Sequence, residues 1–133
     1  MYELGRCTTW EEQRYRAWVF PVVAECPGIE ISRVHPLQQR AVVAIVNVLK
    51  KYDNVDFVVL FGSSTTLRCH GESDLDLVVK LKDPSLESRN EVSEAIQLAC
   101  DWRADILWFD RIKATDSIAY DVNRGVMIYE REV

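Results

Sequence analysis

The feature that most constrains the fold is a pair of short apolar runs joined through a Gly-Ser turn. Residues Val55–Phe61 read VDFVVLF, and residues Leu75–Leu81 read LDLVVKL. β-Branched and aromatic residues in runs of this length favour buried strands. Gly62 and Ser63 follow the first run directly, which predicts a tight turn leaving that strand. The chain is therefore expected to be built around a sheet.

Helical patterns alternate with these extended ones. From Leu37 to Tyr52 the apolar residues fall on one face at helical spacing, which predicts a helix before the first strand. Alternation of helices and strands predicts an α/β (α+β) layer fold. The elements expected after the second strand are a helix at Arg89–Cys100, a strand at Arg103–Phe109, a short helix at Ser117–Arg124 with Gly125 at C′, and an apolar stretch at Val126–Tyr129.

The first third of the chain has a different character. Thr9 and Glu12 fit a capping box for a helix over Trp10–Phe20, which Pro21 would end. The stretch that follows is broken by proline and glycine, with a short strand conceivable at Ile29–Val34. We therefore expect residues 1–36 to be a helical extension and connector, and residues 37–133 to be the main domain.

Composition excludes several classes of protein. With 133 residues, 48% of them hydrophobic and 28% charged, the chain is expected to be one globular domain. No apolar run reaches the roughly 20 residues of a membrane span, and the first residues lack the apolar core of a secretory signal. The net charge of −5 argues against general nucleic-acid binding. Four separated cysteines without a C-x-x-C pair predict free thiols and a cytoplasmic protein.

Three acids stand out as candidate metal ligands. Asp74 and Asp76 frame a strand start, where their Cα atoms would lie about 6.6 Å apart on one face. Two carboxylates at that distance repel by about 2.5 kcal/mol, which a bound Mg²⁺ would offset. Asp105 interrupts the third strand and would join them if the two strands were neighbours. Three carboxylates could hold two metal ions or supply a base. The alternative is that all three acids simply face solvent.

The turn between the strands is a candidate phosphate site. Gly62, Ser63 and Ser64 offer free backbone N–H groups and hydroxyls directly after a strand. Glycine allows a ligand to approach the backbone closely. An ordinary strand-to-helix turn explains the same three residues equally well.

Taken together, these motifs are far more specific than any one of them. The segment Leu60–Val79, LFGSSTTLRCHGESDLDLVV, followed by Ala104–Asp110, ADILWFD, resembles the nucleotidyltransferase superfamily that includes DNA polymerase β. Within it, the chain is similar to the minimal nucleotidyltransferase (MNT) proteins, which often end in a run like the one that closes this chain. The resemblance spans residues 41–130 and implies a polymerase β palm-like fold, a mixed β-sheet flanked by helices.

The resemblance also implies roles for single residues. Gly62 and Ser63 would contact the β- and γ-phosphates of a nucleoside triphosphate, with Ser64 and Arg68 as possible helpers. Asp105 would complete a site for two Mg²⁺ ions and accept the proton of the attacking hydroxyl. The metal ligands implied are Asp74, Asp76 and Asp105, and ATP is the implied substrate.

One position departs from the family pattern. Many members have a second glycine five residues after the first, and this chain has Leu67 there. That side chain would either narrow the approach to the triphosphate or pack under the helix. Arg103 stands two residues before Asp105 and would share its face, pairing with the acids or with the nucleotide. The four tryptophans are expected in the core, although an exposed Trp10 or Trp18 would mark a partner surface.

Function follows from the resemblance and from the small size of the chain. About 40 residues outside the core are too few to enclose a small acceptor, so the acceptor is expected to be a partner protein. MNT proteins commonly pair with HEPN toxins, and some transfer AMP to a toxin tyrosine, thereby acting as antitoxins. Two alternatives remain open: a non-catalytic nucleotide-binding antitoxin or interaction module, and an antibiotic-type nucleotidyltransferase whose site a homodimer completes.

Overall fold

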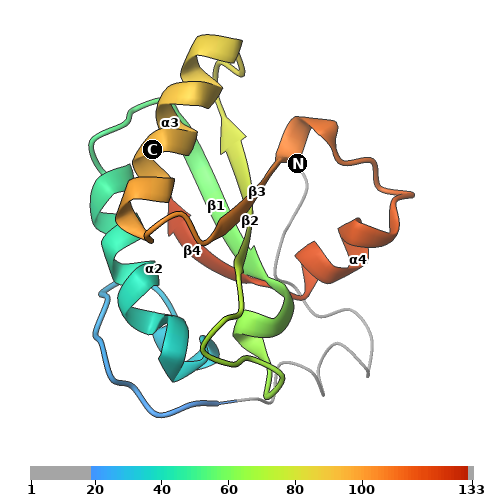
Figure 1. The fold of residues 1–133 in the computed structure, drawn as a ribbon. Coiled ribbons are helices and arrows are strands. Elements are labelled where there is room, and N and C mark those ends of the chain that lie inside the picture. The colour runs from blue at the N-terminus through green and yellow to red at the C-terminus, as the bar shows by residue number, and fades with distance from the viewer. Residues whose placement is uncertain (1–18, 132–133) are drawn as a thin grey trace.

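The computed structural model describes residues 19–131, which form a four-stranded sheet with helices on both faces (Figure 1). The strands are β1 (Val55–Phe61), β2 (Leu75–Leu81), β3 (Ala104–Trp108) and β4 (Val126–Glu130). Their order across the sheet is β3-β2-β1-β4. β1 runs antiparallel to β2 and β4, whereas β2 and β3 are parallel. The sheet is therefore mixed, as predicted.

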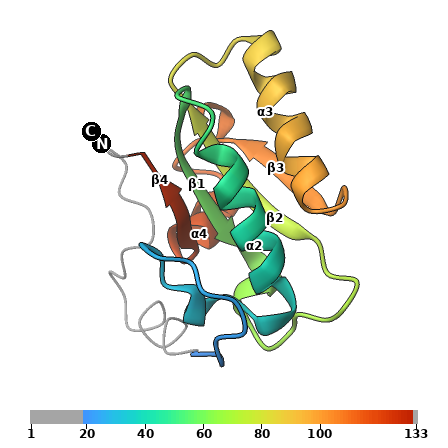
Figure 2. The ribbon, with the colours of Figure 1, turned by 90° about the vertical axis from the view of Figure 1, so that its left-hand side faces the viewer.

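Residues 19–131 also contain three α-helices and three short 3₁₀ turns, of which η1 and α2 precede the first strand. α2 and α3 lie together on one side of the sheet, and α4 lies on the other (Figures 1 and 2). The parallel pair β2 and β3 is joined through α3, which provides the crossover that parallel strands need. The helices are α2 (Pro36–Leu49), α3 (Leu86–Ala99) and α4 (Ser117–Asn123), and the 3₁₀ turns are η1 (Ile31–Arg33), η2 (Gly62–Thr65) and η3 (Phe109–Arg111).

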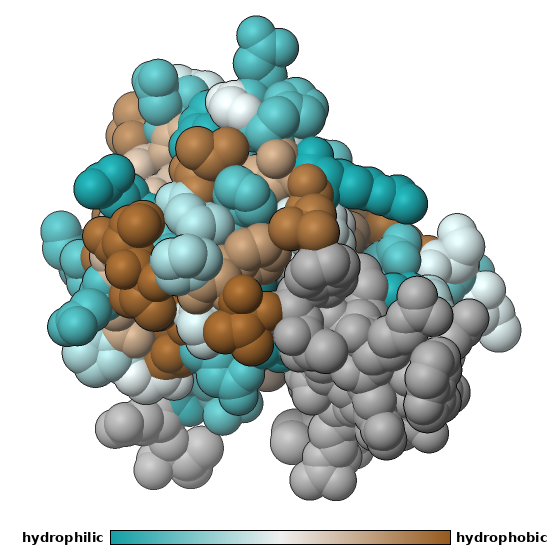
Figure 3. All heavy atoms as spheres, turned by 90° about the horizontal axis from the view of Figure 1, so that it is seen from below, coloured by the Kyte–Doolittle hydropathy of each residue, from teal (hydrophilic) through white to brown (hydrophobic). Residues whose placement is uncertain are grey.

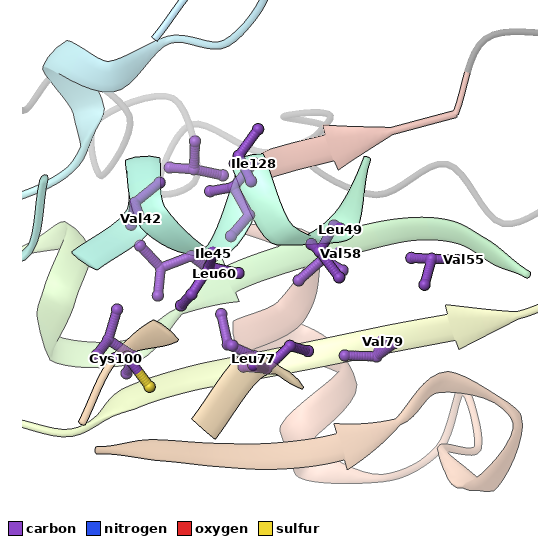
Figure 4. Packing of buried hydrophobic residues seen from close by; sticks show 14 of the residues in the cluster. Val42, Ile45, Leu49, Val55, Val58, Leu60, Leu77, Val79, Cys100 and Ile128 are labelled. Carbon is purple, nitrogen blue, oxygen red and sulfur yellow. The ribbon is translucent and has the colours of Figure 1, made fainter. Parts of the chain in front are cut away.

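The larger core lies between the sheet and the helix pair. Ile45 and Leu49 of α2 pack against Leu60 and Leu77 of the central strands, all of them fully buried (Figure 4). Burial of one such side chain stabilises the fold by about 2 kcal/mol. The helical spacing read from the sequence therefore placed the correct face of α2 against the sheet.

A smaller apolar cluster covers the opposite face. Val59, Phe61 and Val78 from the sheet are buried with Val122 of α4. The ring of Phe57 packs edge-on against Phe109, with ring centres 5.1 Å apart. Because side chains alternate along a strand, residues of this face stand at odd positions of β1 and even positions of β2. Asp76 belongs to this second face.

Predicted element boundaries agree closely with the structure in the second half of the chain. Both β1 and β2 have the bounds predicted, and the short helix and the last strand differ only by single residues at their ends. α3 begins three residues earlier than predicted, because the Ser85 hydroxyl accepts a hydrogen bond from Ser88 N–H at 3.2 Å and caps the helix there.

The connector differs from its prediction. The strand considered at Ile29–Val34 is wrong, because Ile31–Arg33 form the 3₁₀ turn η1. Cys26, Ile31 and Val34 are nevertheless buried in the larger core, so this segment packs against the domain. The helix predicted over Trp10–Phe20 lies almost entirely outside the described residues, and the proposed boundary at residue 36 stays a prediction.

Cysteine chemistry agrees with the prediction where it can be seen. Cys26, Cys69 and Cys100 are free and buried. Burial raises the pKa of the Cys26 and Cys69 thiols, which keeps both in the neutral form. Within residues 19–131, no helix has the length and apolar character needed to cross a membrane.

Gly125 is expected to be required for packing. A Cβ at this position would stand 2.6 Å from the Leu60 carbonyl oxygen and 2.7 Å from a methyl group of Val59. Gly125→Ala should therefore lower the free energy of unfolding by about 1–3 kcal/mol, measured by urea denaturation. Gly71→Ala is the matched control, since a Cβ there would meet nothing within 4 Å. Equal stability of the two variants would contradict the packing argument.

Candidate active site

The Gly-Ser turn and the first acidic strand meet at one end of the second face. β1 leads directly into η2, and Gly62 adopts the left-handed backbone with φ at +75°. A Cβ at Gly62 would collide with the Asp76 carboxylate and stand 3.3 Å from its Cγ. Only glycine satisfies both the conformation and the space. The turn is thus packed onto the carboxylate of Asp76.

Register brings two of the three acids together. Asp76 pairs across the parallel ladder with Asp105 and across the antiparallel ladder with Phe61. Residues directly opposite one another present their side chains on the same face. Asp74 stands one residue before β2, so it approaches the same end of the sheet. The predicted neighbourhood of the two acidic strands is confirmed.

Electrostatics agree with this placement. Burial raises the pKa of the half-buried Asp76 carboxyl, and the Asp105 and Asp74 carboxylates raise it further, in that order. Asp74 and Asp105 themselves are exposed. A half-buried carboxylate repelled by two others is the arrangement that a bound cation would relieve.

The hydroxyl groups of Ser64 and Thr65 are hydrogen-bonded to the backbone. The Ser64 side chain is fully buried, and its hydroxyl donates to the Asp74 carbonyl oxygen at 3.2 Å. Thr65 donates to the Gly62 carbonyl oxygen at 2.9 Å. Ser64 therefore positions the backbone of Asp74, and its hydroxyl is not available as the helper predicted for phosphate binding. Ser63 is only half-buried and stays a predicted phosphate contact.

The residues that follow the turn are exposed. Leu67 is 62% exposed, so it does not pack under the helix. Arg68 is exposed and stays a predicted phosphate contact.

The surroundings of Asp105 correct two further expectations. Arg103 donates to the Gln38 side chain at 3.2 Å and to the Cys100 carbonyl oxygen at 3.4 Å, and not to the acids. Trp102 is 64% exposed rather than in the core. It stands with Asp101 in a left-handed turn after α3, at φ values of 63° and 57°.

Gln38 is the residue of this region that sequence reasoning missed. It is fully buried, and its amide contacts the segments that precede both acidic strands. The signal in the sequence that could have identified it was a polar residue in the first turns of an otherwise apolar helix face. Buried polar side chains of this kind are normally fully hydrogen-bonded.

The donor set suits a hard cation without forming a closed cage. Hard oxygen ligands are those that Mg²⁺ prefers, and Asp76 faces the register partner Asp105. As the side chains stand, no three histidine, cysteine, aspartate or glutamate groups among residues 19–131 converge to hold a metal ion. Asp74 and Asp105 are exposed, so both can rotate toward Asp76 without disturbing the core. The residues fit a cation site that a bound ion would complete.

Comparison with known families identifies the fold. Residues 44–133, more than half of the chain, match the family described as polymerase beta, nucleotidyltransferase. This protein belongs to the polymerase β nucleotidyltransferase family. The family assigns nucleotidyl transfer as its activity and confirms the superfamily to which the sequence motifs pointed.

Solved structures share the same fold. A chain of the complex between a tri-AMPylated HEPN toxin and an MNT antitoxin of Shewanella oneidensis is 21% identical, with a TM-score of 0.52. That match covers 71% of this chain and 73% of the other. A chain of a toxin–antitoxin complex with AMP-PNP is 20% identical, with a TM-score of 0.54 over 68% of this chain and 74% of the other. No curated protein sequence matched.

Asp76→Asn is expected to stabilise the fold at neutral pH. Folding raises the pKa of Asp76 above its ordinary value of 3.8, so ionisation costs stability as the pH rises through that window. The variant should have a higher free energy of unfolding than the natural protein at pH 7, and the difference should shrink as the pH falls toward 3.8. Urea denaturation across this range is the measurement.

Asp83→Asn provides the control for that experiment. It removes the same charge from an exposed turn at the other end of β2. If Asp76→Asn destabilised the protein at pH 7, or if both variants stabilised it equally, the clustering of the three carboxylates would be contradicted.

Proposed function

We propose that this protein is an antitoxin that transfers AMP from ATP to a tyrosine hydroxyl of a HEPN toxin, with Mg²⁺ as cofactor. The observation that carries the proposal is the register pairing of Asp76 with Asp105 beside the Gly62 turn. It places two candidate metal ligands and a candidate phosphate contact at one end of one sheet face. Nucleotidyl transfer needs these elements together.

The reaction joins the acceptor oxygen to the α-phosphorus of ATP. The bond from that phosphorus to the bridging oxygen of pyrophosphate breaks, and pyrophosphate leaves with the bonding electrons. Asp105 takes the proton of the attacking tyrosine hydroxyl, since it is an exposed carboxylate on the open edge of the sheet. Asp74, Asp76 and Asp105 would hold Mg²⁺, which would supply positive charge against the phosphates.

The turn supplies the phosphate contacts. The first backbone N–H groups of a helical turn have no partner within that turn, and Ser63 stands among them in η2. The close packing of Gly62 on Asp76 brings these N–H groups near the metal ligands. Arg68 stands three residues after the end of η2, is exposed, and adds a positive charge close to the turn in the chain.

Surface chemistry near the turn favours a protein acceptor. His35 N–H donates to the Ser64 carbonyl oxygen at 2.7 Å, which brings the start of α2 against η2. Leu37 follows His35 by two residues and Leu67 follows Ser64 by three, and they are 54% and 62% exposed. Figure 3 views this end of the molecule and shows apolar side chains at its surface among polar ones. Exposed apolar groups that adjoin a site are typical of protein interfaces.

Two solved structures of the same fold support the choice of nucleotide and partner in this proposal. One was solved in a complex whose HEPN toxin carries three AMP groups, and another with the ATP analogue AMP-PNP. These observations concern those proteins, and they support the choice of ATP, of AMP transfer and of a HEPN partner for this one.

A non-catalytic antitoxin is the second candidate. Leu67 replaces the usual second glycine, and the acids of the described segment 19–131 are not gathered into a ready metal site. Such a protein would neutralise its partner through the surface alone. Formation of a complex without transfer of AMP is the result that would favour it.

The test uses the full chain, ATP, Mg²⁺ and the native protein that co-purifies with it, with intact mass spectrometry of that partner. We expect the partner to gain the mass of one or more AMP groups. Asp105→Asn should slow the transfer about 10²- to 10⁴-fold, because a general base contributes about that much. Asp110→Asn, which removes the same charge five residues later, should keep the natural rate, since Asp110 pairs with Lys80 at 2.8 Å.

Each other outcome points elsewhere. A stable complex without added mass would indicate the non-catalytic antitoxin. AMP transfer to a small hydroxyl compound without any partner would indicate an antibiotic-type enzyme. Equal rates for Asp105→Asn and Asp110→Asn would overturn the role given to Asp105.

A further inference from the structure

Two consecutive glutamines are buried without belonging to the proposed reaction. Gln38 and Gln39 lie in the first turn of α2, and both side chains are fully inaccessible to solvent. Buried amides are costly unless they are hydrogen-bonded. Because successive residues of a helix point about 100° apart, the two amides reach different parts of the molecule. Their partners show what each one does.

Gln39 ties down the segment that precedes α2. Its side-chain oxygen accepts from Val23 N–H at 2.7 Å and from Ala24 N–H at 3.2 Å. Its nitrogen donates to the carbonyl oxygens of Pro21 at 2.8 Å and Val34 at 3.0 Å. All of these partners lie between residues 21 and 34, so Gln39 acts on the connector alone.

Gln38 reaches the other way, toward the starts of both acidic strands. Its nitrogen donates to the Ser73 carbonyl oxygen at 2.9 Å, and Ser73 immediately precedes Asp74. Its oxygen accepts from the Arg103 guanidinium at 3.2 Å, and Arg103 stands two residues before Asp105. One buried amide therefore connects the backbone leading into β2 with the side chain leading into β3.

The two strands need such a connection at this end. The Asp76–Asp105 pair lies only one step beyond the first pair of the parallel ladder, Leu75–Ala104. Before that step, the strands are joined by the Leu75 N–H bond to the Arg103 carbonyl oxygen at 2.9 Å. Ends of ladders open more readily than their centres. A fixed link from α2 to both strand starts opposes that opening.

We propose that Gln38 is a positioning residue for nucleotidyl transfer, which sets the separation of Asp74 and Asp76 from Asp105 by bridging Ser73 and Arg103. The proposal rests on the proposed function in its assignment of these acids to the reaction. Gln38 touches neither acid side chain, so it acts through the two strand starts. Displacement of a reacting group by about 1 Å costs about 100-fold in rate.

The test compares Gln38→Met with Gln39→Met. Methionine keeps the length of the side chain and removes the amide, and the two glutamines are equally buried neighbours. Gln38→Met should lower kcat about 10- to 100-fold and leave the KM for ATP within about twofold, since the acids act on the reacting atoms. Gln39→Met should leave kcat unchanged, because its partners lie in the connector.

Hydrogen exchange supplies a readout that does not depend on transfer. Gln38→Met should speed exchange of the Leu75 amide about tenfold relative to the Lys82 amide, which bonds to Asn54 at the other end of β2 at 2.8 Å. Gln39→Met should change the two amides equally. If Gln38→Met fails to fold, Arg103→Lys tests the same bridge, because lysine keeps the charge but cannot reach Gln38 and Cys100 at once.

Three results would overturn the proposal. The first is equal loss of kcat in the Gln38 and Gln39 variants. The second is a Leu75 amide in Gln38→Met that exchanges as in the natural protein. The third is a rise of KM for ATP with kcat unchanged. Absence of transfer by the natural protein would instead refute the proposed function, and the exchange rates would still decide whether Gln38 fixes the strand starts.

Discussion

The contact between Gly62 and the Asp76 carboxylate is the constraint on which the rest of the site depends. It requires a residue without a side chain at the end of β1, a left-handed backbone there, and an antiparallel register that places Asp76 opposite Phe61. A shift of one residue in β2 would turn Asp76 into the larger core and an apolar residue toward the turn. Alternate side chains of β1 and β2 are buried in the larger core, and this burial fixes the register. The same register that packs the core therefore also places Asp76 beside the turn.

The two faces of the sheet have different roles: one forms the larger core, and the other carries the acids. Against α2 and α3 the sheet is closed and fully apolar, and this face supplies the larger part of the stabilisation. Against α4 the apolar cluster extends to Phe61, the register partner of Asp76, and the carboxylate of Asp76 beside it is half-buried. The repulsion of the Asp76 carboxylate by Asp105 and Asp74 is tolerated there because packing on the other face stabilises the strands.

Strands β1 and β2 were predictable from the sequence because local pattern determines them. Runs such as Val55–Phe61 and Leu75–Leu81 are mostly apolar and lie between polar, turn-forming residues, so even their bounds agree with the structure. The turn η1, the buried role of Ser64 and the reach of Arg103 depend on partners distant in the chain. Gln38 is the clearest case, since its partners stand 35 and 65 residues away and no local pattern marks them.

The position of β3 at the edge of the sheet has a consequence for how the site can be closed. Among residues 19–131, Asp105 has a neighbouring strand on one side only, and the residue is exposed. A nucleotide held beside it would be open to attack by water as well as by a hydroxyl group. A molecule bound along the β3 edge would then have to shield the nucleotide from hydrolysis by water. An acceptor protein that covered this edge would exclude water from the site, so transfer would begin only when the acceptor binds.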